Sequence, residues 1–166
     1  MPNIITHTVF AEDVLYSILS PRLKELIKEE LPLFYIGSNG PDFLFFYHVK
    51  PWEAHKSHKL NRLGSKVHKQ GINAFYEEAI SCIKHQRNRR IQQRMFVYLL
   101  GHLCHWALDK TTHPYIFYRT GNCKGQSASY HHRLESMIDT EMLLRKKQKT
   151  IVQYPPYDIV KTNNEV

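Results

Sequence analysis

The sequence predicts an all-α fold, in which a single domain is built as a bundle of several helices. Most of the chain carries apolar residues at the spacing of amphipathic helices, and strand-like alternation is nearly absent. The chain has 166 residues, 42% of them hydrophobic, so it is long enough to bury a core of its own. We expect the helical domain to span residues 1–150. Residues 151–166 contain two prolines and no periodicity, which is typical of a C-terminal tail.

The first two helices are expected at residues 7–19 and 21–30. Apolar side chains recur at helical spacing in both segments. Ser20 is a typical N-cap residue, and Pro21 is typical of the first helical position. Pro32 is expected to end the second helix. The sequence GSNGP at residues 37–41 then indicates a turn with special backbone angles.

Three further segments complete the predicted bundle. Residues 64–86 return to helical periodicity, and residues 87–109 form a helix whose second half is apolar. Pro114 disfavours the α conformation at His113, so we expect this helix to break near His113. A loop over residues 111–129 and a last helix over residues 129–146 follow. Residues 49–64 are predicted to be a polar loop, and surface positions are expected for three histidines in or beside it: His48, His55 and His58.

Composition and charge limit the classes of partner and location. The net charge of +8, with histidine neutral, suits an anionic partner such as a phosphate group. Three cysteines without paired spacing suit a reducing compartment, and the N-terminal segment lacks the pattern of a signal peptide. No apolar run is long enough to span a bilayer. We therefore predict a cytoplasmic protein without a transmembrane segment.

Histidines and carboxylates concentrate between residues 101 and 139. His105 and Asp109 are four residues apart, so on a helix both side chains leave the same face. His131 and Glu135 repeat this spacing, and His113 lies between the two pairs. One such pair is commonly a surface hydrogen bond or a packed core histidine. Two pairs with a third histidine favour a metal centre, because neutral imidazole and ionised carboxylate are ligands that suit zinc.

Other residues near this pattern have more than one interpretation. His102 lies on the same helix as His105 and is expected to be a partner of a ligand or a packed neutral imidazole. Asp139 continues the face of the second pair. His7 is a metal ligand, or it is a helix cap or a surface residue. Asp42 is an N-cap, or it is a carboxylate directed into a site.

The run LCHWALDKTTHPY, followed by YHHRLESMIDT, resembles the bacterial zinc-dependent phospholipase C family, whose all-helical fold is shared with the S1/P1 nucleases. The resemblance extends from about residue 7 to residue 139 and implies a cluster of three zinc ions. In secreted members the amino group of a mature N-terminal Trp is also a ligand. This chain begins with Met1-Pro2, so we expect that position to have one ligand fewer. The metal ligands implied by the resemblance are His7, Asp42, His68, His105, Asp109, His113, His131 and Glu135.

The resemblance also implies how these ligands are divided. His105 and Asp109 belong to a bridged pair of ions, for which His7 supplies the first histidine. The third ion is held by His113, His131 and Glu135, and it would stabilise the leaving oxygen. GSNGPD is similar to the turn that carries the aspartate of the family, here Asp42, and GSKVH provides the next zinc histidine, His68.

We therefore expect a phosphoric ester hydrolase, a phospholipase C-like phosphodiesterase, in which two or three zinc ions activate water. Asp42 is the candidate catalytic residue that orients or deprotonates this water. The substrate is a phosphate-containing small molecule or a lipid head group, for which the aromatic run FLFFY and Trp52 could form an apolar entrance. The alternatives are a non-catalytic metal protein that binds a phosphate-bearing ligand, and a nuclease-like hydrolase. No stable nucleic acid complex is expected, because the basic clusters lack interleaved aromatic residues.

Overall fold

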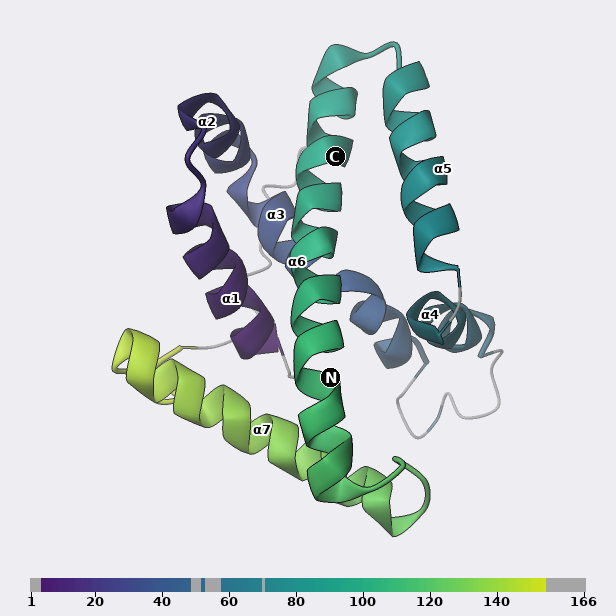
Figure 1. The fold of residues 1–166 in the computed structure, drawn as a ribbon, viewed down its shortest axis with the longest axis vertical. Coiled ribbons are helices and arrows are strands. Elements are labelled where there is room, and N and C mark those ends of the chain that lie inside the picture. Colours follow the sequence, from purple (N-terminus) through teal and green to yellow (C-terminus); the bar gives the residue numbers. More distant parts are fainter. Residues whose placement is uncertain (1–3, 49–51, 53–57, 70, 155–166) are drawn as a thin grey trace.

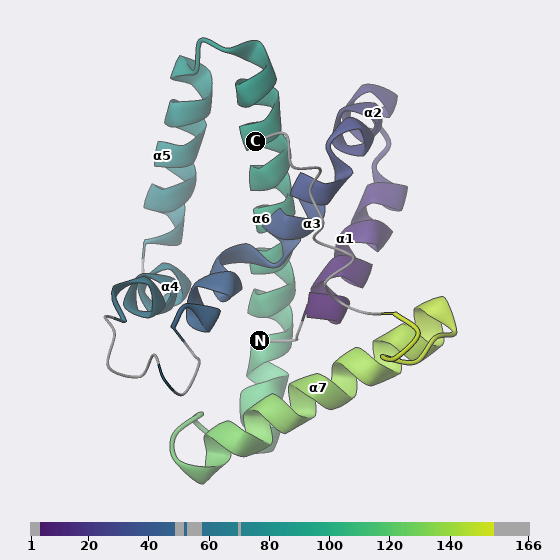
Figure 2. The same ribbon diagram turned by 180° about the vertical axis from the view of Figure 1, so that it is seen from behind.

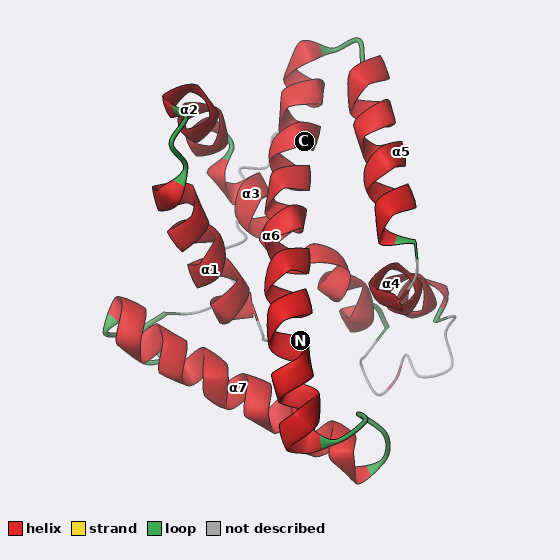
Figure 3. Ribbon diagram, in the orientation of Figure 1, coloured by secondary structure: helices red, strands yellow, loops and turns green. Residues whose placement is uncertain are grey.

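The computed structural model describes residues 4–48, 52, 58–69 and 71–154. Every regular element within these ranges is a helix, which confirms the predicted all-α class (Figure 3). The elements in chain order are α1 (Ile4–Ser17), α2 (Pro21–Glu29), α3 (Leu31–Ser38), the 3-10 helix η1 (Gly40–Phe46), α4 (Lys59–Lys69), α5 (Ile72–His85), α6 (Arg89–Thr120) and α7 (Gln126–Lys147).

The helix α6 is the axis of the molecule (Figure 1). Helices α1, α2 and α3 pack on one side of it, whereas α4 and α5 lie on the other side (Figures 1 and 2). Helix α7 crosses the C-terminal end of α6 and also contacts α1. Side chains from helices far apart in the sequence therefore meet around the C-terminal half of α6.

The contact between α3 and α6 is unusually close because each helix presents a glycine. A Cβ atom on Gly37 would lie 2.2 Å from the carbonyl oxygen of Tyr98, and one on Gly101 would lie 2.1 Å from that of Phe34. Neither position has room for a larger residue. The apolar core packs beside this contact and consists of Ala11, Leu15, Ile27, Phe34, Val97 and Cys104.

Helix α1 is attached to α7 at both of its ends. At its beginning, the backbone N–H groups of Ile5 and Thr6 donate to the Asp139 carboxylate. At its other end, Lys147 donates to Glu12, and Lys146 donates to Asp13 at 2.7 Å. A smaller apolar cluster of Ile5, Val9 and Leu143 fills the space between these attachments.

The second predicted helix is confirmed, and a further helix, α3, follows it directly. The Ser20 hydroxyl accepts a hydrogen bond from the N–H of Leu23, and Pro21 occupies the first turn. Pro32 does not end the helical structure. It lies in the first turn of α3, where the proline ring is tolerated because no intrahelical N–H bond is needed there.

The predicted break of the helix near His113 is wrong. Pro114 lies inside α6, which continues to Thr120. A proline removes the hydrogen bond to the carbonyl four residues earlier, here that of Lys110. Both Pro114 and Lys110 are exposed, so water can solvate this carbonyl, while the fully buried Ile116 keeps the following turn packed. Because α6 continues past Pro114, His113 and His105 lie on the same helix.

Two boundaries of the predicted loops also differ. The loop expected over residues 111–129 is only residues 121–125, between Gly121 and Gly125, whose φ angles are 89° and 56°. The segment at residues 64–86 is interrupted at Gly71, whose φ angle of 70° separates α4 from α5. Helix α4 begins at Lys59 and so includes part of the predicted polar loop. His55, Met1, Pro2 and residues 155–166 of the predicted tail lie outside the described residues.

Candidate metal centre

Five of the predicted ligands converge from four helices on one cluster, which we call the first cluster. It consists of His7 of α1, Asp42 of η1, His68 of α4, and His105 and Asp109 of α6. The ligand atoms of His7, Asp42 and His105 lie within 4.8 Å of one another, as do those of His68, His105 and Asp109. His105 belongs to both groups.

Asp109 is at the centre of the first cluster. Its Oδ2 atom lies 3.3 Å from Nε2 of His105 and 3.9 Å from Nε2 of His68. Its Oδ1 atom lies 3.4 Å from Nε2 of His7. On the other side of the cluster, Oδ1 of Asp42 lies 2.9 Å from Nε2 of His68 and 3.6 Å from Nε2 of His105. The Nε2 atoms of three imidazoles thus face the oxygens of two carboxylates.

The second cluster consists of the three residues His113 of α6 and His131 and Glu135 of α7. The Oε1 atom of Glu135 lies 2.8 Å from Nε2 of His131 and 4.0 Å from Nε2 of His113. The Nδ1 atom of His113 lies 3.7 Å from Oδ1 of Asp109, so the two clusters adjoin each other at this carboxylate.

Hydrogen bonds at Nδ1 orient several of these rings. Nδ1 of His68 lies 2.8 Å from the carbonyl of Gly64, and Nδ1 of His113 lies 3.0 Å from that of Asp109. Nδ1 of His131 lies 3.4 Å from the hydroxyl of Thr120, which itself donates to the carbonyl of Ile116. A carbonyl accepts only from a protonated Nδ1, and this tautomer leaves the lone pair of Nε2 available to a metal ion.

The first cluster contains buried polar atoms that fit a cation. Both ring nitrogens of His7, Nδ1 of His105 and Oδ1 of Asp109 are buried without a hydrogen bond to any described residue. His7 is 1% exposed. Leaving such groups unpaired in a protein interior costs free energy, and a metal ion would satisfy imidazole and carboxylate lone pairs together. The donor set of nitrogen and oxygen atoms is one that zinc accepts.

The protonation states also favour a cation. Burial opposes the charge of Asp109, but its contacts with His105 and His7 outweigh burial and hold the pKa of this carboxyl well below its ordinary value. Burial lowers the pKa of His7 and of His113, and it lowers that of His131 to about 4. These residues are therefore a carboxylate and neutral imidazoles near neutral pH, which are the forms that bind metals.

His68 differs from the other histidines. Burial lowers its pKa, but the hydrogen bonds with Asp42 and with the Gly64 carbonyl outweigh burial, so that the pKa is raised. Its Nε2 atom is 2.9 Å from Asp42, and these two side chains form the more exposed wall of the first cluster.

His102 is a packed neutral imidazole, one of the two roles expected for it. Its Nδ1 atom lies 3.0 Å from the hydroxyl of Tyr76, and its ring packs against Phe75 with centroids 4.7 Å apart. Burial lowers its pKa to about 4. It lies behind His105, with ring centroids 6.0 Å apart, and is not part of either cluster.

The structure thus brings all eight predicted ligands into two adjoining clusters. His48 and His58 belong to neither. Sequence reasoning missed three residues that support the clusters: Gly40, Thr120 and the backbone of Gly64. A Cβ on Gly40 would lie 2.4 Å from Cδ2 of His105. The turn sequence around Gly40 was a signal for special backbone angles but did not reveal this contact.

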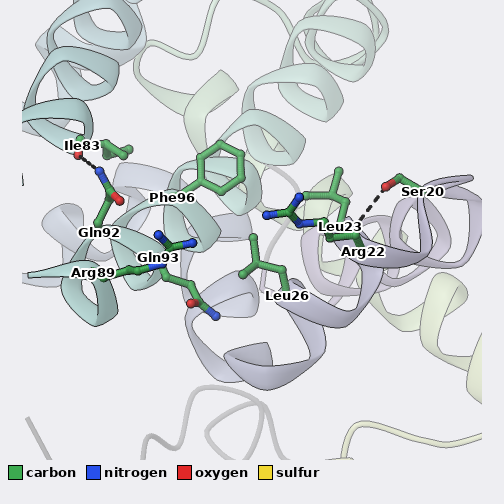
Figure 4. Close-up of a pocket in the computed structure, with 9 residues that line it drawn as sticks. All are labelled: Ser20, Arg22, Leu23, Leu26, Ile83, Arg89, Gln92, Gln93 and Phe96. Carbon is green, nitrogen blue, oxygen red and sulfur yellow. Dashed lines mark hydrogen bonds between the residues drawn. The ribbon is translucent and has the colours of Figure 1, made fainter.

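A shallow cleft of about 450 Å³ lies elsewhere, at the N-terminal half of α6 (Figure 4). Two of its polar groups are already paired, since Gln92 donates to the carbonyl of Ile83 and the Ser20 hydroxyl accepts from Leu23. The cleft contains none of the residues of the two clusters. Its lining residues are Ser20, Arg22, Leu23, Leu26, Ile83, Arg89, Gln92, Gln93 and Phe96.

The fold and the clusters define a class: an all-helical protein with a centre of buried histidines and carboxylates drawn from five of its helices. A sequence profile of the family described as zinc dependent phospholipase C matches residues 6–165. The chain belongs to this family, which confirms the resemblance found from the motifs. No curated protein and no solved structure gave a match.

Proposed function

We propose that the protein is a zinc-dependent phosphodiester hydrolase of the phospholipase C type. The observation that carries this proposal is the convergence of five histidines and three carboxylates on two adjoining clusters. A site that only stabilised the fold would use one closed set of four ligands. Two clusters that meet at Asp109 are better suited to hold several ions beside one substrate.

The chain's own residues would divide between the two clusters. His7, Asp42, His68, His105 and Asp109 would hold a pair of zinc ions, and His113, His131 and Glu135 would hold a third. Zinc bound there would supply a water of lowered pKa and would neutralise the charge of the phosphate and of the leaving oxygen. The low pKa of Asp109 keeps this carboxylate ionised beside the imidazoles.

Asp42 is the proposed proton acceptor. It is less buried than Asp109, and its Oδ1 atom contacts Nε2 of both His68 and His105. In the proposed reaction the oxygen of a water bonds to phosphorus and Asp42 accepts its proton. The bond between phosphorus and the glycerol oxygen breaks, and that oxygen takes up the proton that Asp42 accepted, which restores the Asp42 carboxylate. The products are a diacylglycerol and a phosphorylated head group.

A lipid substrate is supported by two exposed aromatic residues that follow Asp42 in the chain. Phe43, which follows it directly, is 53% exposed, and Trp52 is 69% exposed. Contact with the acyl chains of a phospholipid is more favourable for exposed aromatic side chains than contact with water. The net charge of +8 suits the phosphate of the substrate. The described residues contain no helix long and apolar enough to cross a membrane.

The test combines metal analysis with two substrates. Protein purified without chelator is analysed for zinc, and the same sample is assayed with bis-p-nitrophenyl phosphate and with a short-chain phosphatidylcholine, with diacylglycerol as the measured product. Two or more zinc ions per chain with turnover of both substrates are expected. Turnover of the first substrate alone would contradict the lipid specificity, and zinc without any turnover would contradict the hydrolase.

A further inference from the structure

We propose that Asp139 of α7 is a positioning residue that sets His7 against Asp109 and so assembles the first cluster. This inference rests on the proposed metal centre, although it does not require that the centre hydrolyses anything. Asp139 belongs to neither cluster, and no ligand role is assigned to it. Its position one helical turn after Glu135 places it on the same face of α7 as His131 and Glu135.

Asp139 holds the first turn of α1 by several bonds. Its Oδ1 atom accepts from the backbone N–H of Thr6 at 2.9 Å and from the Thr6 hydroxyl. Its Oδ2 atom accepts from the N–H of Ile5 at 3.2 Å. The first N–H groups of a helix have no partner inside the helix, and a carboxylate there also interacts favourably with the helix dipole. Here the capping group comes from a distant helix rather than from the preceding residue.

The residue that follows this anchored pair is His7. Its ring stacks on His105 with centroids 4.3 Å apart and an interplanar angle of 23°. Its Nε2 atom lies 3.4 Å from Asp109. Because the two preceding backbone N–H groups are fixed to Asp139, a rotation or a shift of α1 along its axis would break these bonds. The bonds therefore determine where His7 points.

The burial of Asp139 is difficult to explain by attachment of α1 alone. Asp139 is 3% exposed, and burying a carboxylate costs free energy that its hydrogen bonds must offset. The far end of α1 is already attached to α7 through the pairs of Lys147 with Glu12 and Lys146 with Asp13. Apolar contacts of Ile5 and Val9 with Leu143 add to this attachment. Asp139 additionally fixes the rotation and the axial position of the first turn of α1. These two quantities determine where the side chain of His7 lies.

One consequence is that α7 serves both clusters. It supplies His131 and Glu135 to the second cluster directly, and through Asp139 it fixes the His7 ligand of the first. Loss of the carboxylate should therefore weaken zinc binding at the first cluster and leave the second cluster intact. A residue with a purely structural role would lower stability without separating the two classes of zinc.

The experiment compares Asp139→Asn with the wild type and with Asp13→Asn, a matched control at the exposed pair on the other end of α1. Zinc is measured by titration with a competing chelator, which resolves strong and weak ions, and folding is followed by circular dichroism. For Asp139→Asn we expect about 10- to 100-fold weaker binding of the first-cluster zinc, with the second-cluster zinc unchanged. Wild-type affinity for every zinc ion, in a variant with lowered melting temperature, would overturn the proposal.

Thr6→Val is the second variant, and it tests the proposal if Asp139→Asn does not fold. It removes the hydroxyl donor to Asp139 and keeps both backbone N–H bonds. A smaller, several-fold loss of affinity confined to the first cluster is expected, and unchanged affinity would overturn the proposal. Turnover is measured on the same samples. A wild type that binds zinc but hydrolyses nothing would contradict the proposed function and leave the role of Asp139 standing.

Discussion

The Nε2 atom of His7 lies 3.4 Å from Oδ1 of Asp109, so the first helix of the chain and the C-terminal half of its longest helix contribute to one cluster. The two residues lie on helices far apart in the sequence, so local spacing does not bring them together. The contact depends on the packing of α1 against both α6 and α7. The integrity of the first cluster is therefore a property of the whole fold.

The first prediction concerns Asp109, whose carboxylate contacts three histidines of the first cluster. Asp109→Asn keeps the shape of the side chain but removes its charge, so none of these contacts is any longer between a carboxylate and an imidazole. We expect turnover to fall by more than about 100-fold and zinc content to fall with it. Steady-state kinetics and elemental analysis on one sample measure both quantities. Full activity in this variant would contradict the proposed centre, and Asp13→Asn serves as the control at an exposed pair.

A second prediction separates the two clusters. Glu135 is 1% exposed and its Oε1 atom lies 2.8 Å from Nε2 of His131. Glu135→Gln replaces the anionic ligand of the second cluster by a neutral amide, so about one zinc ion per chain should be lost while first-cluster zinc is retained. Elemental analysis gives the stoichiometry. Glu141→Gln, on the exposed side of the same helix, should keep the full complement of zinc. Retention of all zinc by Glu135→Gln would refute this assignment.

Helical spacing was sufficient to predict the parts of the site that lie on one helix. His105 with Asp109, and His131 with Glu135, are each four residues apart, and such residues share a face whatever surrounds the helix. His7, Asp42 and His68 were assigned through the resemblance, because the residues around them left caps and surface positions open. Which side chains meet across α1, η1 and α4 is set by tertiary packing, and a local pattern does not contain that information.

The error at Pro114 has the same origin. The local rule against proline in a helix is correct, but its cost depends on whether the carbonyl four residues earlier can be solvated. That carbonyl belongs to Lys110, on the exposed side of α6, and the exposed side becomes known only when the neighbouring helices are placed. Asp139 was similarly recognised as part of a helix face, whereas its partners Ile5 and Thr6 lie at the other end of the chain.

The third prediction uses two glycines that both have a positive φ angle. Gly40 has a φ angle of 52°, and a Cβ there would lie 2.4 Å from Cδ2 of His105. Gly40→Ala should displace this imidazole and lower zinc affinity by more than about 10-fold. Gly71 has a φ angle of 70° but nothing within 4 Å of a Cβ. Gly71→Ala should therefore cost only about 1 kcal/mol of folding free energy and leave zinc affinity unchanged. Equal zinc affinity in the two variants would contradict the contact between Gly40 and His105.

The fourth prediction concerns the acid sensitivity of the fold. Burial lowers the pKa of His102 to about 4, whereas in the unfolded chain it has its ordinary value of 6.5. Between these two values the unfolded chain binds a proton that the folded chain does not bind. The stability that His102 contributes is therefore present above pH 6.5 and is lost as the pH falls towards 4. The full loss corresponds to about 3 kcal/mol.

His102→Leu removes this titration and should make the free energy of unfolding less dependent on pH in that range. Urea unfolding of the chelator-treated wild type and variant at several pH values measures the difference in slope. His85→Leu is the matched control, because His85 is an exposed histidine on α5 that bonds only the carbonyl of Ser81 among the described residues. If His102→Leu keeps the wild-type slope, the inference that buried His102 is neutral is wrong, because a histidine protonated equally in the folded and unfolded chain contributes no dependence on pH.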